Sequence, residues 1–289
     1  MYFFYKENPK YKISIEGKFE LLDLLIEELY PYIDYSYDNC DCNLTLCIEI
    51  GNLNETIHRS NNYFVLKYDN IDKLINMARK ITRDILYSKV FQKYSQLHAG
   101  MVEINNCGIL IIGPSGKGKT STIITLLNEL NNVKFISNDR IIINKDNLYM
   151  LGWPTSIGVG EFANKYFCIN AIAYKSRNKY WYNIRDLKRN NIECVKKAKC
   201  KLCIAPNFLK SKSDTTISSV DTVQLLKSNL RNDFELGNNY LNEKYACVPV
   251  NKTIYENKEL LTLPSFEITT TGISSDYIAA LKEVIYENL

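Results

Sequence analysis

The chain has 289 residues, of which 46% are hydrophobic, 12% aromatic and 24% charged. This composition is typical of globular proteins and excludes disordered and fibrous classes. The net charge of +4 is too small to require a polyanionic partner, so nucleic acid is not predicted to bind. At about 100 to 200 residues per domain, the length predicts one large domain or two.

Targeting signals and cysteines bear on where the chain works. No apolar run approaches the roughly 18 residues of a transmembrane helix, and the N-terminus has no basic segment followed by an apolar stretch. The nine cysteines are an odd number in a chain long enough to fold without disulfides, which favours reduced thiols and a cytoplasmic location. Structural zinc on Cys200-Lys-Leu-Cys203, or on the Cys40, Cys42 and Cys47 group, is an alternative, but each lacks a second half with ligand spacing.

Residues 1–94 carry no catalytic signature and are predicted to form a small N-terminal α+β domain. Apolar, β-branched and aromatic residues between turn clusters predict strands at 11–15, 44–50 and 63–66. Helical spacing of apolar residues predicts helices over 21–30 and over 71–94, the second with Asn70 as its N-cap.

The next segment predicts an α/β nucleotide-binding unit. Two strand-like runs between residues 101 and 112 flank Asn105-Asn106, a pair that tolerates positive φ and therefore predicts a hairpin turn. A glycine-rich loop, a helix over 119–130 and a buried strand over 133–137 follow. Further along, a second hairpin is predicted for 141–144 and 148–151 around Asp146-Asn147, and a final helix for 276–288 with its cap near Ser275.

The glycine-rich loop, Gly113-Pro-Ser-Gly-Lys-Gly-Lys-Thr120, matches G-x-x-x-x-G-K-[ST] in full. Its glycines allow backbone N–H groups to surround phosphate oxygens, and the following helix adds the positive end of its dipole. Lys119 is expected to contact the β- and γ-phosphates, and the Thr120 hydroxyl to ligate Mg²⁺. The alternative is a glycine-rich turn with an unrelated lysine. The predicted nucleotide-binding residues are Gly113, Pro114, Ser115, Gly116, Lys117, Gly118, Lys119, Thr120 and Ser121.

A nucleotide-bound Mg²⁺ usually has a carboxylate at the end of a neighbouring strand. Asp139 directly follows the apolar run 135–137, so it can face the phosphates from the carboxyl edge of the sheet. We therefore predict Asp139 as a metal ligand and catalytic residue. The alternative is an ordinary aspartate in a turn at a strand end.

The segment from Leu97-His98-Ala-Gly through the P-loop, together with 135–140 and Trp153-Pro-Thr155, resembles the HPr kinase/phosphorylase family. The resemblance runs from about residue 95 to the end of the chain. It implies a P-loop kinase domain related to phosphoenolpyruvate carboxykinase, which uses ATP to phosphorylate a hydroxyl, often serine of a protein or peptide. Relatives with this layout include kinases that tailor ribosomally made peptides.

The resemblance also implies a place for His98 near the transferred phosphate, where it can act as a base or stabilise charge. The alternative is a hydrogen-bonded histidine that fixes the hairpin. The family usually carries two adjacent aspartates at the strand end, whereas this chain has Asn138-Asp139, and an amide cannot take up a proton near neutral pH. The long glycine-rich stretch of full HPr kinases is absent, so neither phosphorylase activity nor HPr as substrate is predicted.

Three further features each have two interpretations. Arg140 can pair with a phosphate or with a neighbouring acid. Glu161 can reach the site from its loop, although a solvated side chain is favoured. The basic segment 188–201 is either a solvated face, the favoured interpretation, or a strip that binds an acidic peptide.

The prediction is therefore an α/β protein with an N-terminal domain at 1–94 and an HPr kinase-like, ATP- and Mg²⁺-dependent kinase domain at 95–289. Lys119, Asp139 and His98 are the predicted catalytic residues, and the acceptor is a hydroxyl of a peptide, protein or small molecule. Asn138 favours the alternative of a nucleotide-binding regulator or inactive kinase. A nucleotide-hydrolysing switch is less favoured because no water-positioning glutamine is evident. The acceptor and the formation of homo-oligomers are left open.

Overall fold

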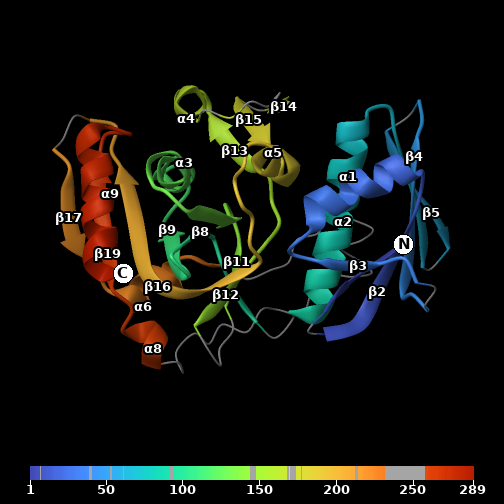
Figure 1. The fold of residues 1–289 in the computed structure, drawn as a ribbon, viewed down its shortest axis with the longest axis horizontal. Coiled ribbons are helices and arrows are strands. Elements are labelled where there is room, and N and C mark those ends of the chain that lie inside the picture. The colour runs from blue at the N-terminus through green and yellow to red at the C-terminus, as the bar shows by residue number, and fades with distance from the viewer. Residues whose placement is uncertain are drawn as a thin grey trace. The chain divides into compact units, whose positions relative to one another are not determined.

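The computed structural model describes residues 1–6, 8–38, 41–52, 54–60, 62–91, 94–143, 148–167, 169, 174–176, 178–211, 214–231 and 258–289. Chain contacts divide them into two compact units, residues 1–91 and residues 94–231 together with 258–289. Each unit combines helices with a sheet of mixed strand direction (Figure 1), so the protein is of the mixed α/β class. Among the helices in these ranges, none has the length and apolar character needed to cross a membrane.

The first unit is a six-stranded sheet with two helices. Its strand order is β3-β1-β2-β4-β6-β5, in which β2, β4 and β6 run parallel and the other strands join antiparallel. The elements in chain order are β1 (Tyr2–Tyr5), β2 (Asn8–Glu16), α1 (Phe19–Leu29), β3 (Asp34–Ser36), β4 (Leu44–Ile50), β5 (Glu55–Ser60), β6 (Tyr63–Tyr68) and α2 (Ile71–Val90).

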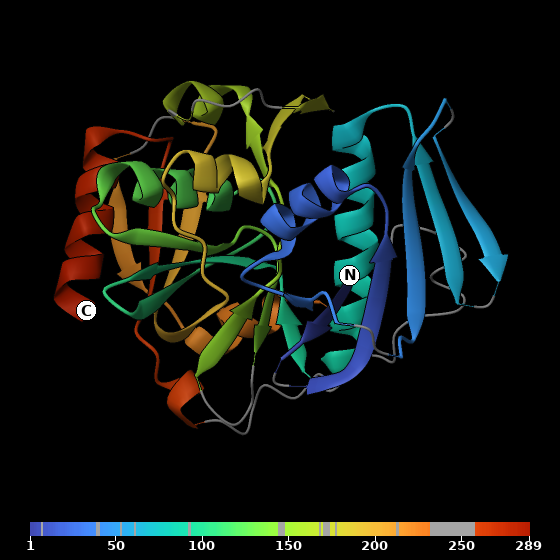
Figure 2. The same cartoon turned by 45° about the vertical axis from the view of Figure 1, so that its right-hand side comes forward.

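Alternating burial explains why the helices cover one face of this sheet. In β4, Leu44, Leu46 and Ile48 are buried, while the residues between them are less buried. Side chains of a strand point alternately to opposite faces, so one face is apolar and needs a cover. Helix α2 contacts β1, β2, β4 and β6 and also packs on α1, and Figure 2 shows both helices on the same side of the sheet.

The predicted strands and helices of this unit are confirmed in type, with shifted ends. The side chain of Asn70 caps α2 by accepting a hydrogen bond from the backbone N–H of Lys73 at 3.1 Å, as predicted. The predicted extension of this helix to residue 94 is wrong. The helix ends at Val90, and the Phe91 ring packs against the rings of Tyr5 and Tyr87, with centroids 4.8 and 4.9 Å away.

The second unit is built on a ten-stranded sheet with the path β10-β8-β9-β16-β12-β11-β7-β18. Strand β19 pairs with β16, and β17 pairs with β19. A separate sheet has the order β13-β15-β14. The strands are β7 (Ser95–Leu97), β8 (Ala99–Ile104), β9 (Cys107–Ile112), β10 (Val133–Ser137), β11 (Ile141–Ile143), β12 (Tyr149–Gly152), β13 (Ile157–Gly160), β14 (Tyr174–Ser176), β15 (Lys179–Tyr182), β16 (Lys197–Phe208), β17 (Thr216–Ser219), β18 (Leu230–Arg231) and β19 (Ser265–Thr270). The helices are α3 (Lys119–Glu129), α4 (Glu161–Tyr166), α5 (Ile184–Arg189), α6 (Thr222–Ser228), α8 (Lys258–Leu261) and α9 (Ser275–Asn288).

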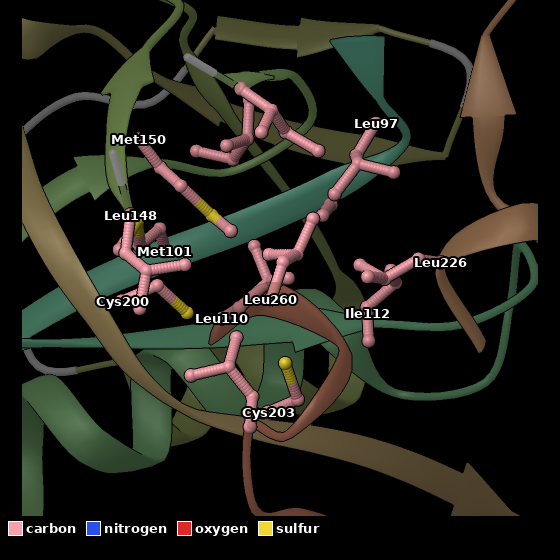
Figure 3. Close-up of a cluster of buried hydrophobic side chains, with 14 of the residues drawn as sticks. Leu97, Met101, Leu110, Ile112, Leu148, Met150, Cys200, Cys203, Leu226 and Leu260 are labelled. Atoms are coloured by element: carbon pink, nitrogen blue, oxygen red, sulfur yellow. The ribbon is translucent and has the colours of Figure 1, made fainter. Parts of the chain in front are cut away.

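Strand β16 joins three other strands of this sheet, β9, β12 and β19. One edge pairs in parallel with β9, and the other pairs first with β12, antiparallel, and then with β19, parallel. Buried apolar side chains of β16 and of neighbouring strands pack with those of α6 and α8. Met101, Leu110, Cys203, Leu226 and Leu260 are among them (Figure 3). This core fixes the strands that lead into the P-loop.

The local predictions for this unit also stand. Asn105 and Asn106 have φ of 50° and 63° and close the β8–β9 hairpin, as predicted. Strands β11 and β12 pair antiparallel, although their predicted turn at Asp146-Asn147 lies outside the described residues. The cap of the last helix is Ser274, beside the predicted Ser275, and its side chain accepts a hydrogen bond from the backbone N–H of Tyr277 at 3.2 Å.

Candidate functional site

Strand direction brings the predicted site residues to one edge of the second unit's sheet. Strand β8 is antiparallel to both β9 and β10, so the end of β9, the end of β10 and the start of β8 all lie at this edge. The P-loop follows Ile112 at the end of β9, Asp139 follows β10 by two residues, and His98 directly precedes β8. Residues far apart in the sequence therefore meet where the glycine-rich loop leads into helix α3 (Lys119–Glu129).

Three glycines set the backbone of the loop at residues 113–120. Gly113, Gly116 and Gly118 have φ of +148°, +80° and +101°, a region that residues with a side chain rarely adopt. A Cβ at Gly116 would meet no atom within 4 Å, so the loop faces open space there. Thr120 and Ser121 lie in the first turn of α3, where backbone N–H groups are not used within the helix.

The C-terminal part of the chain supports this loop through hydrogen bonds and ring packing. The backbone N–H of Phe208 donates to the carbonyl oxygen of Lys117 at 3.2 Å, and Lys117 Nζ donates to Asn207 Oδ1 at 2.9 Å. The Phe208 ring packs edge-on against Tyr277 of α9, and the Tyr277 hydroxyl is hydrogen-bonded to Thr122 of α3. The end of β16 and α9 thus position the loop.

Lys119 lies inside the loop. Its residue is 7% exposed, and Nζ donates to the carbonyl oxygens of Gly113 at 2.6 Å and Pro114 at 3.0 Å. Burial lowers the pKa of Lys119 to about 8, with nearby Asp139 opposing the shift and the charges of Arg231 and Lys179 adding to it. The Lys119 side chain is therefore buried against carbonyl oxygens of the loop.

Asp139 is the centre of a charged cluster. Arg231 Nη2 lies 3.1 Å from Oδ1 and 3.2 Å from Oδ2, and His98 Nε2 lies 3.3 Å from Oδ1. Arg140 Nε is 3.9 Å from Oδ2, and its guanidinium stacks over the Trp153 ring at 5.2 Å. Of the two interpretations of Arg140, pairing with a neighbouring acid agrees with this contact.

The cluster decides the charge of Asp139. Burial alone would raise the pKa of this carboxyl group, but the hydrogen bond from His98 and the charges of Arg231, His98 and Arg140 lower it to about 2. Asp139 is therefore a carboxylate across the physiological pH range. A permanently ionised oxygen ligand is what Mg²⁺ prefers.

Asn138 occupies the position before Asp139. The residue is 9% exposed, and its Oδ1 is buried without a hydrogen-bond partner among the described residues. Two hydrogen bonds hold the segment. Ser137 Oγ donates to the Trp153 carbonyl oxygen at 2.8 Å, and the backbone N–H of Trp153 donates to the carbonyl oxygen of Arg140 at 3.2 Å. The predicted Trp153-Pro-Thr155 loop therefore supports the strand end that carries Asn138 and Asp139.

Two further candidates are Glu161 and the basic segment 188–201. Glu161 is an exposed residue at the start of α4. In the basic segment, Lys197 and Lys201 are exposed and alternate with buried Ala198 and Cys200 along β16, which is the pattern of a solvated strand face. Among the described residues, no group of three or more His, Cys, Asp or Glu side chains lies together, so zinc on the Cys200 and Cys203 pair has no third described ligand.

The donors at this edge fit a nucleotide with Mg²⁺. Positive-φ glycines, Lys119 and the start of an 11-residue helix offer donors and positive charge to phosphates. The Thr120 hydroxyl and the Asp139 carboxylate are oxygen ligands suited to Mg²⁺. Two such ligands are enough only if phosphate oxygens and water supply the others, as in sites that bind the metal with a nucleotide.

Arg231 and Phe208 are the site residues that sequence reasoning missed. Arg231 is 92 residues from Asp139 in the chain and lies on a two-residue strand. Phe208 is the last residue of β16 and reaches Gly118 through the parallel pairing of β16 with β9. Neither lies in a motif or a periodic pattern, so no local signal identifies it.

Substitution of Gly118 tests how the loop is held. A Cβ at Gly118 would lie 2.6 Å from the Phe208 ring, in addition to the backbone strain at φ +101°. We expect Gly118→Ala to lower the free energy of unfolding by about 2 kcal/mol or more without nucleotide. Gly116→Ala is the matched control, because it adds strain at φ +80° but no clash. Urea unfolding of both variants measures the difference, and equal losses would show that the Phe208 contact does not matter.

Comparisons with known proteins find likenesses of structure alone. No family model matches the chain, and no curated protein matches it. Among solved structures, the chain is similar to the Hpr(Ser) kinase/phosphatase from Coxiella burnetii, with 13% sequence identity over 66% of this chain and 88% of that one, at a TM-score of 0.31.

Proposed function

We propose that the protein is an ATP- and Mg²⁺-dependent kinase of the HPr kinase-like group that transfers the γ-phosphate to a hydroxyl of a peptide or protein, with serine as the expected acceptor. The observation that carries the proposal is the meeting of a complete P-loop, His98 and an ionised Asp139 at one sheet edge. We also propose that residues 1–94 and 95–289 are the two domains of this enzyme.

Each residue has a role that its surroundings support. The P-loop N–H groups and Lys119 bind and orient the phosphates, and Thr120 with Asp139 would hold Mg²⁺, which neutralises charge on the phosphate oxygens. His98 donates from Nε2 to Asp139 Oδ1 at 3.3 Å, so its other ring nitrogen, Nδ1, can accept the proton of the acceptor hydroxyl, and the neighbouring carboxylate then stabilises the imidazolium. Phosphoryl transfer requires mostly positioning and charge neutralisation, so these groups suffice.

Phosphate transfer itself is the test of the proposal. The protein is incubated with γ-labelled ATP, Mg²⁺ and candidate peptides encoded beside its gene, and the acceptor is identified by a gain of phosphate in mass spectrometry. We expect transfer by the wild type and a loss of roughly 10² or more in Asp139→Asn, because the carboxylate's charge acts on the metal ion. Metal-free ATP binding should stay within a few-fold in this variant. Equal losses of metal-dependent activity and metal-free binding would make Asp139 a structural residue.

A nucleotide-binding regulator is the second candidate, and Asn138 favours it. The amide stands where a second carboxylate is usual in the family that the sequence resembles, and it cannot serve as a base. ATP binding with no transfer to any peptide, protein or small-molecule hydroxyl would support this candidate over the kinase.

A further inference from the structure

The two oxygens of Asp139 already have a cation in contact. A single nitrogen of Arg231, Nη2, lies 3.1 and 3.2 Å from the two oxygens, so it sits between them. This is the position that a metal ion takes on a carboxylate that binds it through both oxygens. His98 Nε2 approaches Oδ1, and Arg140 Nε lies 3.9 Å from Oδ2, so the carboxylate is surrounded by positive or donor groups.

The fold delivers Arg231 to this position by fixed elements. Strand β18 pairs with β7, with Arg231 opposite Gln96, and the backbone N–H of His98 donates to the carbonyl oxygen of Asn229 at 2.8 Å. The preceding helix α6 is anchored by Leu226, which is fully buried, and by Thr222 Oγ1, which donates to the Leu263 carbonyl oxygen at 2.8 Å. These contacts hold the strand that carries Arg231 beside β7 and His98.

A guanidinium and a divalent ion cannot share the same place between the two oxygens, and their charges repel at such short range. Building on the proposed function, we propose that Arg231 occupies the metal position of Asp139 and competes with Mg²⁺ for it. Metal binding then exchanges one cation for another. Arg231 is therefore a positioning residue that holds Asp139 when no metal is bound and weakens metal binding in the absence of nucleotide.

Nucleotide favours the exchange because it offers the displaced guanidinium a new anionic partner. The charge of Arg231 contributes to the lowered pKa of Lys119, so negative charge placed beside Lys119 would also attract this guanidinium. Phosphates bound at the loop would attract Arg231 away from Asp139 and leave that carboxylate to the metal. Metal and nucleotide affinities are then coupled through Arg231, and by linkage the coupling is equal in both directions.

The experiment uses Mn²⁺ as the probe in place of Mg²⁺, because its free concentration can be followed by electron paramagnetic resonance. Mn²⁺ is titrated into the full chain without nucleotide and then with a non-hydrolysable ATP analogue. We expect Arg231→Gln to bind Mn²⁺ about tenfold more tightly than the wild type without nucleotide, and to show a smaller gain on adding the analogue. Arg140→Gln is the matched control and should change Mn²⁺ affinity by less than about threefold, because its guanidinium is farther from Asp139 and stacks on Trp153.

Two further variants keep the outcome decisive. Arg231→Gln combined with Asp139→Asn should lose the gain in Mn²⁺ affinity, and Arg231→Met repeats the test with an uncharged side chain if the glutamine variant does not fold. Unchanged or weaker Mn²⁺ binding in a folded Arg231 variant, or no measurable binding in any variant, would overturn the proposal. A tenfold gain with no phosphate transfer would uphold the exchange and reject the kinase, so the two failures can be told apart.

Discussion

Lys119→Ala should remove most of the stabilisation that Mg²⁺-ATP gives the folded protein. A ligand at a thousandfold excess over its dissociation constant adds about 4 kcal/mol to the free energy of unfolding, and this is the shift expected of the wild type. The substitution deletes the ammonium group that we propose contacts the β- and γ-phosphates. Thermal unfolding with and without Mg²⁺-ATP measures the loss.

The control for this prediction is a lysine outside the loop. Lys134 Nζ pairs with Glu193 at 3.1 Å and with Glu103 at 3.5 Å, so Lys134→Ala should keep the ATP-induced shift. The ligand-free midpoint of Lys119→Ala has to be measured separately, because the variant also loses hydrogen bonds to Gly113 and Pro114. An undiminished ATP shift in Lys119→Ala would show that this loop does not bind the nucleotide.

His98→Ala should reduce turnover by roughly 10² to 10⁴ and leave ATP affinity within a few-fold, as expected for the loss of a general base. Among the described residues in contact with Asp139, the imidazole is the group that can accept a proton near neutral pH, since the others are arginines. His98→Asn is the sharper variant, because it keeps hydrogen-bonding capacity and cannot be protonated. Steady-state kinetics with the identified acceptor measure both. Normal turnover by His98→Ala would mean that the reaction needs no base from this residue.

Asn138→Asp separates an active kinase from an inactive one. The buried Oδ1 of Asn138 lacks a partner among the described residues, so a carboxylate there can receive a hydroxyl proton. We expect Asn138→Asp to restore part of the rate lost in His98→Ala. Transfer by Asn138→Asp but none by the wild type would instead favour the inactive-kinase alternative.

Features that depend on neighbouring residues could be predicted from the sequence. Asn105 and Asn106 adopt positive φ at the hairpin, Asn70 caps α2, and β10 spans the predicted residues 133–137. The P-loop motif likewise prescribes its own glycine conformations. Each of these is a local preference of the backbone, which a few adjacent residues determine.

The surroundings of the site were decided by tertiary structure alone. Arg231 reaches Asp139 because β18 pairs with β7, and Phe208 reaches Gly118 because a 12-residue strand spans the sheet. The burial of Lys119, with its lowered pKa, comes from the same packing. Contacts between residues so far apart in the chain depend on strand order and register, and these minimise the free energy of the whole sheet and its core. No short segment of sequence encodes them.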